Sequence, residues 1–155
     1  MMKIISIIGP SNPGEIEYSF AENIGYLLAK DGFVVATGGK GGIMEAALKG
    51  AKSAKGITLG ILPEETPKNA NPYADIVVPT GIGICRNFIL VNLASVVISA
   101  GYSEGTLTEI AIANKLKKPL IGFNVPELPG VGIIFVSSPE EALAKVRELV
   151  KEAIW

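Results

Sequence analysis

Short apolar runs alternate with longer amphipathic stretches along the whole of this chain. The short runs, such as Ile4 to Ile8 and Val96 to Ile98, are rich in Ile and Val and have the length of strands. Predicted strands cover 3–8, 33–37, 57–62, 75–78, 95–99, 119–122 and 132–136. Predicted helices cover 15–31, 42–54, 84–93, 105–117 and 139–153. This alternation is typical of right-handed crossovers between parallel strands.

The pattern predicts an α/β fold with a three-layer, doubly wound, mostly parallel Rossmann-like sheet of about seven strands. Hydrophobic residues make up 48% of the chain, which fits central strands buried on both faces. No apolar run approaches the roughly 18 residues of a membrane-spanning helix, so we expect no membrane association. With 155 residues and no linker or repeat, residues 1–155 are predicted to form a single nucleotide- or phosphate-binding domain.

Composition narrows the chemistry further. The chain has no histidine, which excludes triads with a histidine base and argues against a zinc site, and we expect neither a metal nor a cofactor. The one cysteine, Cys85, cannot form an internal disulfide and is expected to be a buried thiol. Together with the lack of a secretory signal, this predicts a cytoplasmic protein. A net charge of −1 without a basic stripe argues against nucleic-acid binding.

A glycine-rich turn follows the second predicted strand. Four of its five residues are glycine: Gly38, Gly39, Gly41 and Gly42. Glycine allows positive φ and close approach of backbone N–H groups, and the helix that follows adds unpaired donors and the positive end of its dipole. The segment therefore predicts an anion-binding turn. Glu45 in the first helical turn is equally consistent with ligand contact and with dipole stabilisation.

Five loops with unusual composition each follow the carboxyl end of a predicted strand. In an open parallel sheet those ends share one edge, where ligands bind at the topological switch point. We therefore expect the loops to converge on one pocket, to which the first contributes Gly9 and Ser11. The five loops are 9–14, 38–42, 63–72, 79–86 and 101–106.

Charged and hydroxyl residues mark the last two of these loops. Gly105 and Thr106 form a second phosphate-type turn, and Glu109 lies about one helical turn further on. Thr106 and Glu109 also have capping-box spacing, so Glu109 could serve only to cap its own helix. Arg86 opens another predicted helix, where a cation opposes the dipole, and an anionic ligand or acidic partner explains that position better than stability does.

These segments resemble the LONELY GUY-type proteins, once described as lysine decarboxylases, over about residues 3–122. The resemblance rests on Gly38-Gly39, Gly41-Gly42-Ile43-Met44-Glu45, Arg86 and Gly105-Thr106-Leu107-Thr108-Glu109. It implies a Rossmann-like fold, homodimers and phosphoribohydrolase activity on cytokinin-type nucleoside 5′-monophosphates. The family's Pro-Gly-Gly is replaced here by Gly101-Tyr102-Ser103, and its Arg-Lys pair by Arg86-Asn87. In these departures the chain is similar to a short prokaryotic subgroup related to molybdenum cofactor carrier proteins.

Two functions follow from the residues and the resemblance. In the first, which we favour slightly, the glycine turns and Thr106 hold the 5′-phosphate of a nucleotide while Arg86 and Glu109 promote hydrolysis of its N-glycosidic bond. In the second, the same turns hold a phosphorylated pterin such as molybdenum cofactor without turnover. Both require a small phosphorylated ligand. We also expect a homodimer or larger homo-oligomer, with four apolar positions available for a partner: Leu90, Leu93, Ile112 and Leu116.

Overall fold

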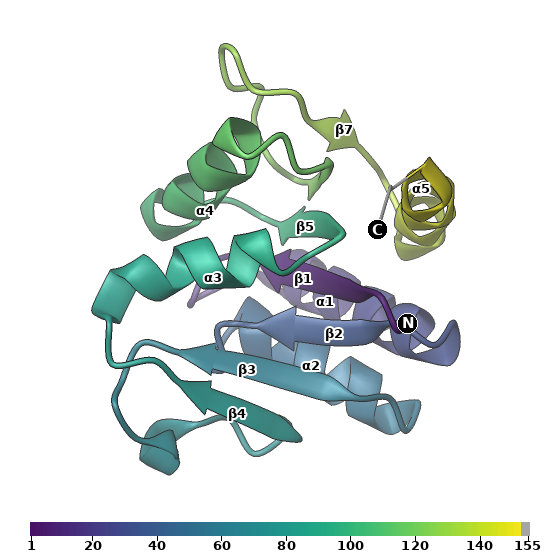
Figure 1. The fold of residues 1–155 in the computed structure, drawn as a ribbon. Coiled ribbons are helices and arrows are strands. Elements are labelled where there is room, and N and C mark those ends of the chain that lie inside the picture. The colour runs from purple at the N-terminus through teal and green to yellow at the C-terminus, as the bar shows by residue number, and fades with distance from the viewer. Residues whose placement is uncertain (153–155) are drawn as a thin grey trace.

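The apolar runs form one parallel sheet in the computed structural model, which describes residues 1–152 (Figure 1). Its strand order is β4-β3-β2-β1-β5-β6-β7, and every neighbouring pair is parallel. All seven predicted strands are present, most of them within one or two residues of the predicted bounds. They are β1 (Ile4–Ile8), β2 (Val34–Thr37), β3 (Thr58–Leu62), β4 (Ile76–Pro79), β5 (Val96–Ala100), β6 (Leu120–Phe123) and β7 (Ile134–Phe135).

Helices cover both faces of the sheet, as expected for a doubly wound Rossmann-like fold. The helices α1, α2 and α5 pack on one face, and α3 and α4 pack on the other. The α-helices are α1 (Glu15–Lys30), α2 (Ile43–Ser53), α3 (Arg86–Asn92), α4 (Glu104–Lys115) and α5 (Pro139–Glu152), and two short 3-10 helices are η1 (Pro67–Asn69) and η2 (Gly83–Cys85). None of the helices described is both long and apolar enough to cross a membrane.

The central strands are buried on both faces because helices lie above and below them. In β1, Ile5 and Ile7 pack against α1 and α2, whereas Ile8 packs in the opposite core with α3 and α4. Complete burial of each such side chain contributes about 1.5–3 kcal/mol relative to exposure. The one polar residue of β1, Ser6, is also buried, and its hydroxyl donates to the carbonyl oxygen of Leu90 at 2.8 Å.

Of the four apolar positions expected to be available for a partner, the prediction is wrong for Leu90, whereas the other three stay partly exposed. Leu90 is only 1% exposed and belongs to the core under α3 and α4. Leu93, Ile112 and Leu116 are partly buried against the same core. The helical period predicts which residues share a face of the helix. It does not predict which of those faces packs against the sheet.

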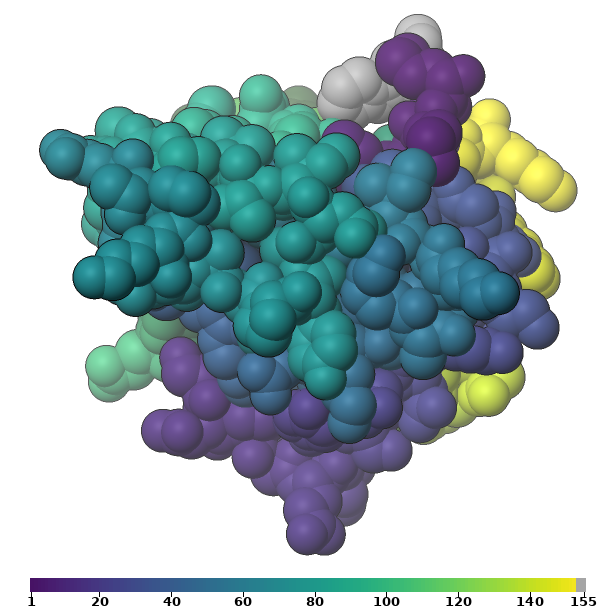
Figure 2. All heavy atoms as spheres, turned by 90° about the horizontal axis from the view of Figure 1, so that it is seen from below, coloured from purple at the N-terminus to yellow at the C-terminus, as the bar shows by residue number. Residues whose placement is uncertain are grey.

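The edge strand β4 is short and ends at Pro79, which limits pairing with another chain at this edge. Figure 2 shows the molecule from this side, with the blue and teal residues of β3, β4 and the loops around them covering much of the surface. Ile76 and Val78 are among the exposed apolar residues of this edge.

The order of the strands creates one topological switch point. From β1 the chain proceeds through β2 and β3 to β4, and α3 then carries it back to β5 on the other side of β1. The loops that follow β1 and β5 therefore diverge, because α1 covers one face of the sheet and α4 the other (Figure 1). This arrangement leaves room for a ligand between the two loops.

Candidate functional site at the carboxyl edge

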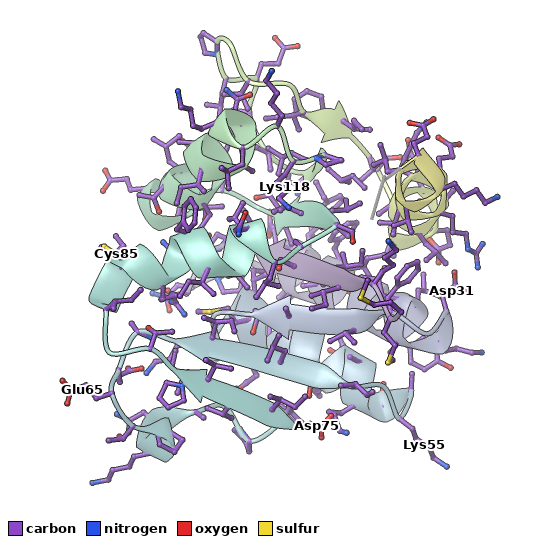
Figure 3. All side chains as sticks on the ribbon, viewed as in Figure 1. Asp31, Lys55, Glu65, Asp75, Cys85 and Lys118 are labelled. Atoms are coloured by element: carbon purple, nitrogen blue, oxygen red, sulfur yellow. The ribbon has the colours of Figure 1, made fainter. Side chains whose placement is uncertain are left out.

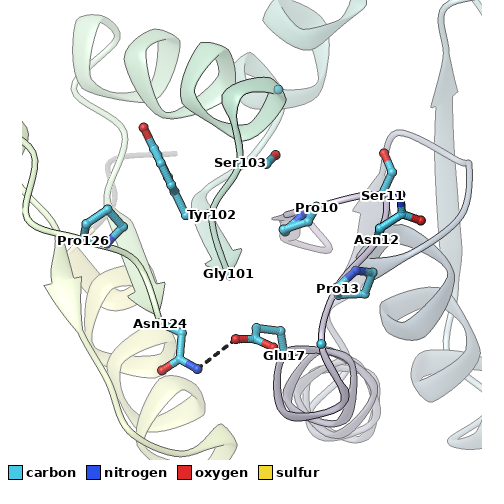
Figure 4. A pocket seen from close by; sticks show the side chains of 12 residues that line it. Pro10, Ser11, Asn12, Pro13, Glu17, Gly101, Tyr102, Ser103, Asn124 and Pro126 are labelled. Atoms are coloured by element: carbon cyan, nitrogen blue, oxygen red, sulfur yellow. Dashed lines mark hydrogen bonds between the residues drawn. The ribbon is translucent and has the colours of Figure 1, made fainter.

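Two adjoining cavities lie at the carboxyl edge of the sheet. The smaller, here called the arginine pocket, has a volume of about 330 Å³ and receives residues from all five of the loops named above. The larger, here called the switch-point crevice, has a volume of about 780 Å³ and lies between the loops after β1 and β5 (Figure 4). Ser11, Ser103 and Gly105 line both cavities, so the two form one continuous recess.

Arg86 is fixed at the wall of the arginine pocket by backbone carbonyls. Its Nη1 donates to the carbonyl oxygens of Gly38 at 2.6 Å and Ile61 at 2.5 Å, which ties the start of α3 to the ends of β2 and β3. Its Nε donates to Oδ1 of Asn87 at 2.9 Å. Asn87 in turn donates to Thr108 Oγ1 at 3.1 Å, which connects the arginine to α4. The guanidinium is thus held rigidly and keeps its positive charge in the pocket.

Glu109 projects from α4 into the same pocket. Burial raises the pKa of its carboxyl to about 7, although the positive charge of Arg86 acts in the opposite direction. Among the described residues, no direct ion pair joins Glu109 to Arg86. A carboxyl with this pKa exchanges a proton near neutral pH, as a general acid or base requires.

The capping role considered as one alternative for Glu109 is filled by another residue. Ser103 is the N-cap of α4: its hydroxyl accepts from the backbone N–H of Thr106 at 3.3 Å and lies 2.8 Å from Thr106 Oγ1. The helix therefore begins at Glu104, one residue earlier than predicted, and Glu109 lies beyond its first turn. Of the two alternatives left open for Glu109, the structure excludes the one in which it only caps its own helix.

Most of the glycine-rich turn supports the fold around the recess. Gly42 has φ 66°, and a Cβ there would lie 2.4 Å from the carbonyl oxygen of Ser11. The N–H of Ile43 donates to the carbonyl oxygen of Pro10 at 3.2 Å, and that of Gly39 to Thr37 Oγ1 at 3.0 Å. The contacts of Gly42 and Ile43 hold the loop after β1 against the start of α2, whereas that of Gly39 fixes the turn to the end of β2.

Glu45 also makes a structural contact. Its carboxylate accepts from Nδ2 of Asn71 at 2.9 Å, and the same nitrogen donates to the carbonyl oxygen of Lys40 at 3.1 Å. The loop after β3 is fastened to α2 in this way. Of the two alternatives for Glu45, the structure favours stabilisation.

The predicted site residues therefore fall into two groups. Those that line the arginine pocket are Gly9, Ser11, Gly38, Arg86, Gly105, Thr106 and Glu109. Those that lie outside both cavities are Gly39, Gly41, Gly42 and Glu45. Cys85, expected to be buried, is exposed at the end of η2, next to the start of α3 (Figure 3).

The prediction from sequence missed the far side of the switch-point crevice. Glu17 of α1 and Asn124 and Pro126 after β6 line this side (Figure 4), together with Tyr102, which lies in the predicted loop 101–106 but was not predicted as a site residue. Asn124 and Pro126 could have been found, because the loop after β6 follows a strand end at the same edge as the other five. Glu17 could not, because an acidic residue in a first helical turn is already explained by the helix dipole.

Comparison with known proteins agrees with this architecture. The model of the SLOG cluster4 family matches residues 2–153. An uncharacterized protein of Archaeoglobus fulgidus is 40% identical over 139 residues, which cover 90% of this chain and 91% of that protein. Both matches extend over nearly the whole chain.

Two solved structures share the complete fold. The molybdenum cofactor binding protein of the phototrophic bacterium Rippkaea orientalis is 35% identical, with a TM-score of 0.91 over 97% of this chain and 98% of that one. The molybdenum cofactor carrier protein of Chlamydomonas reinhardtii is 29% identical, with a TM-score of 0.90 over 97% and 99%. Both agree with the resemblance drawn from the glycine turns, Arg86 and Glu109.

Proposed function

The chain belongs to the SLOG cluster4 family, and from this premise we propose that it binds a phosphorylated pterin of the molybdenum cofactor type and carries it without turnover. The observation that carries the proposal is the continuous recess at the switch point, in a chain that matches two molybdenum cofactor-binding proteins over nearly its full length. Each of the two cavities, at about 330 and 780 Å³, lies within the range of volumes usual for small-molecule sites.

In this proposal, the phosphate of the ligand binds where the two cavities meet. Ser11, Ser103 and Gly105 line this junction, and the N-terminus of α4 adds the positive end of its dipole. Arg86 contributes a full positive charge on the side of the arginine pocket. In the crevice, by contrast, the carboxylate of Glu17 would repel a phosphate. The charges thus favour one orientation, with the phosphate at the junction and the rest of the ligand in the crevice.

A second function, hydrolysis of an N-glycosidic bond, is favoured by one observation. Glu109 has a pKa of about 7 and lines the same pocket as Arg86. A carboxylate there would stabilise the positive charge that develops on a ribose as its bond to the base breaks. In this function the substrate is a nucleoside 5′-monophosphate with its phosphate at the same junction.

One pair of assays separates the two functions. Molybdenum cofactor released from a molybdoenzyme is kept in air with this protein or with serum albumin, and is then used to reconstitute a cofactor-free enzyme. A carrier prolongs the lifetime of reconstituting activity, whereas albumin does not. In parallel, a panel of nucleoside monophosphates is assayed for free base with wild-type protein and Glu109→Gln.

The combined results of the protection assay and the base-release assay distinguish the two functions. Protection without base release supports the carrier. Base release that Glu109→Gln abolishes overturns the carrier proposal in favour of the hydrolase. Neither protection nor release would contradict both proposals.

We also propose that the chain forms a homo-oligomer through the surface of η2, α3 and α4. Exposed apolar side chains gather on these elements: Ile84 is 68% exposed, Phe88 49% and Leu107 40%. Ile84 also lines the arginine pocket, so this surface borders the proposed ligand site. An apolar surface next to a functional site is typical of an interface.

A further inference from the structure

Resting on the proposed function, we infer that Glu17 and Asn124 recognise the N–H edge of the ligand's heterocycle. The edge they suit is that of a 2-amino-4-oxopyrimidine, which pterins and guanine share and adenine lacks. The two residues thereby select the class of ring that enters the switch-point crevice.

The two side chains meet across the crevice from distant parts of the chain. Nδ2 of Asn124 donates to Oε1 of Glu17 at 3.1 Å, a bond drawn in Figure 4. Asn124 has φ 52°, a left-handed conformation that asparagine tolerates better than most residues and that presents its amide at the strand end. Glu17 is half-buried and lines the cavity.

Gly101 leaves the space that Glu17 occupies. A Cβ at Gly101 would lie 3.0 Å from Cγ of Glu17 and 3.3 Å from Cδ of Pro10. Gly101 also has φ 81°, so both the positive φ and the lack of space for a Cβ favour glycine at this position. The end of β5 therefore leaves room for the side chain of Glu17, a residue that lines the crevice.

The walls of the crevice suit a flat ring. Tyr102 and Pro126 lie on one side, and Pro10 and Pro13 lie on the other, with the backbone of Gly101 and Ser103 between them in the view of Figure 4. Aromatic and prolyl side chains present flat apolar surfaces against which a heterocycle can stack. Between these walls, the carboxylate and the carboxamide are the polar groups at the end of the crevice where Glu17 meets Asn124.

The hydrogen-bonding pattern then decides which ring fits. A carboxylate accepts two hydrogen bonds side by side, and a 2-amino-4-oxopyrimidine offers a ring N–H and an exocyclic NH₂ next to each other. The second N–H of the Asn124 amide can donate to the neighbouring oxo group. Where the 2-amino-4-oxopyrimidine has its ring N–H, adenine has a ring nitrogen with a lone pair. That lone pair would be repelled by the carboxylate. This pattern is independent of the phosphate contacts at the junction of the cavities.

Binding of GMP, IMP and AMP, measured by calorimetry, tests the inference with one phosphate and one ribose throughout. We expect GMP to bind more tightly than AMP by about tenfold or more, the scale of a charge-assisted hydrogen bond. IMP, which has the ring N–H but no exocyclic amine, should lie between them. Glu17→Gln should bring the affinity for GMP close to that for AMP, and AMP should bind at least as tightly as before, because its ring nitrogen no longer faces a carboxylate. Glycine at position 124 tolerates the positive φ, so Asn124→Gly should weaken the binding of GMP and IMP but not the binding of AMP.

Glu15→Gln is the matched control, because Glu15 lies in the same helical turn but does not line the crevice. It should change none of the three affinities. Equal binding of GMP and AMP, or a preference for GMP that survives Glu17→Gln, would overturn the inference. Competition by inorganic phosphate is measured in the same titrations: nucleotide binding that phosphate cannot displace contradicts the proposed phosphate site itself. The two failures are therefore distinguishable.

Discussion

At the scale of single residues, the most informative side chains are two charged groups that share one pocket. Arg86 donates from Nη1 to the carbonyls of Gly38 and Ile61 and from Nε to Asn87, which holds its charge at the wall of the pocket. Among the described residues, Glu109 makes no such hydrogen bond, and burial raises the pKa of its carboxyl to about 7. The pocket therefore contains one fixed charge and one charge that depends on pH.

The raised pKa of Glu109 predicts a specific dependence of stability on pH. The unfolded chain releases this proton near the ordinary value of 4.5, whereas the folded protein retains it up to about pH 7. The folded state thus binds more protons between these values, and the free energy of unfolding falls as pH rises through this window. Glu109→Gln should remove this loss and stabilise the protein at pH 8 by at most about 3 kcal/mol relative to wild type.

Denaturant unfolding of both proteins at pH 4.5 and pH 8 measures this effect. Glu104→Gln, which changes an exposed residue of the same helix, should leave the pH dependence as it is. A Glu109→Gln variant with the wild-type pH dependence would show that Glu109 is solvated normally.

At the scale of elements, the glycine-rich turn between β2 and α2 joins two loops. Gly42 lies against the backbone of Pro10 and Ser11, and the hydrogen bond from the N–H of Ile43 to the carbonyl oxygen of Pro10 closes the contact. A sequence motif typical of anion binding thus also shapes the wall of a neighbouring cavity, because the loop after β1 lines both cavities.

Two adjacent glycines of this turn should respond very differently to alanine. Gly42→Ala forces a positive φ on alanine and places its Cβ 2.4 Å from a backbone oxygen, and should destabilise the protein by about 2 kcal/mol or more. Gly41→Ala meets nothing within 4 Å and should change stability by less than about 0.5 kcal/mol. Thermal unfolding compares the two variants. Equal losses at both positions would refute this account of the turn.

At the scale of the whole molecule, the apolar surface beside the arginine pocket predicts self-association. Ile84, Phe88 and Leu107 come from η2, α3 and α4 and remain exposed in the single chain. Phe88→Glu should convert an oligomer to monomers, because a charge would be buried in the interface without a partner. Light scattering after gel filtration measures the mass directly.

Phe135→Glu provides the control for this experiment. Phe135 is 46% exposed on β7, at the opposite edge of the sheet from β4 and outside the proposed interface. It should leave the mass unchanged. Wild-type protein that elutes with the mass of one chain would contradict the proposed oligomer.

The sequence by itself determined the elements, their order and the edge at which the loops meet. These features depend on local period and on the fixed hand of parallel crossovers, and both can be read from residue types and spacing. For the same reason the positions of Arg86 and Thr106 in the arginine pocket followed from their place after strand ends. The extent of the domain as residues 1–155 remains a prediction of this kind.

Only the tertiary structure decided which side chains face one another. The pairing of Glu17 with Asn124 joins residues 107 positions apart, and no period or spacing encodes it. The burial of Leu90, the exposure of Cys85 and the structural contacts of Gly42 and Glu45 depend likewise on which surface a neighbouring element covers. Local pattern specifies the face of an element, whereas packing between distant segments specifies what that face touches.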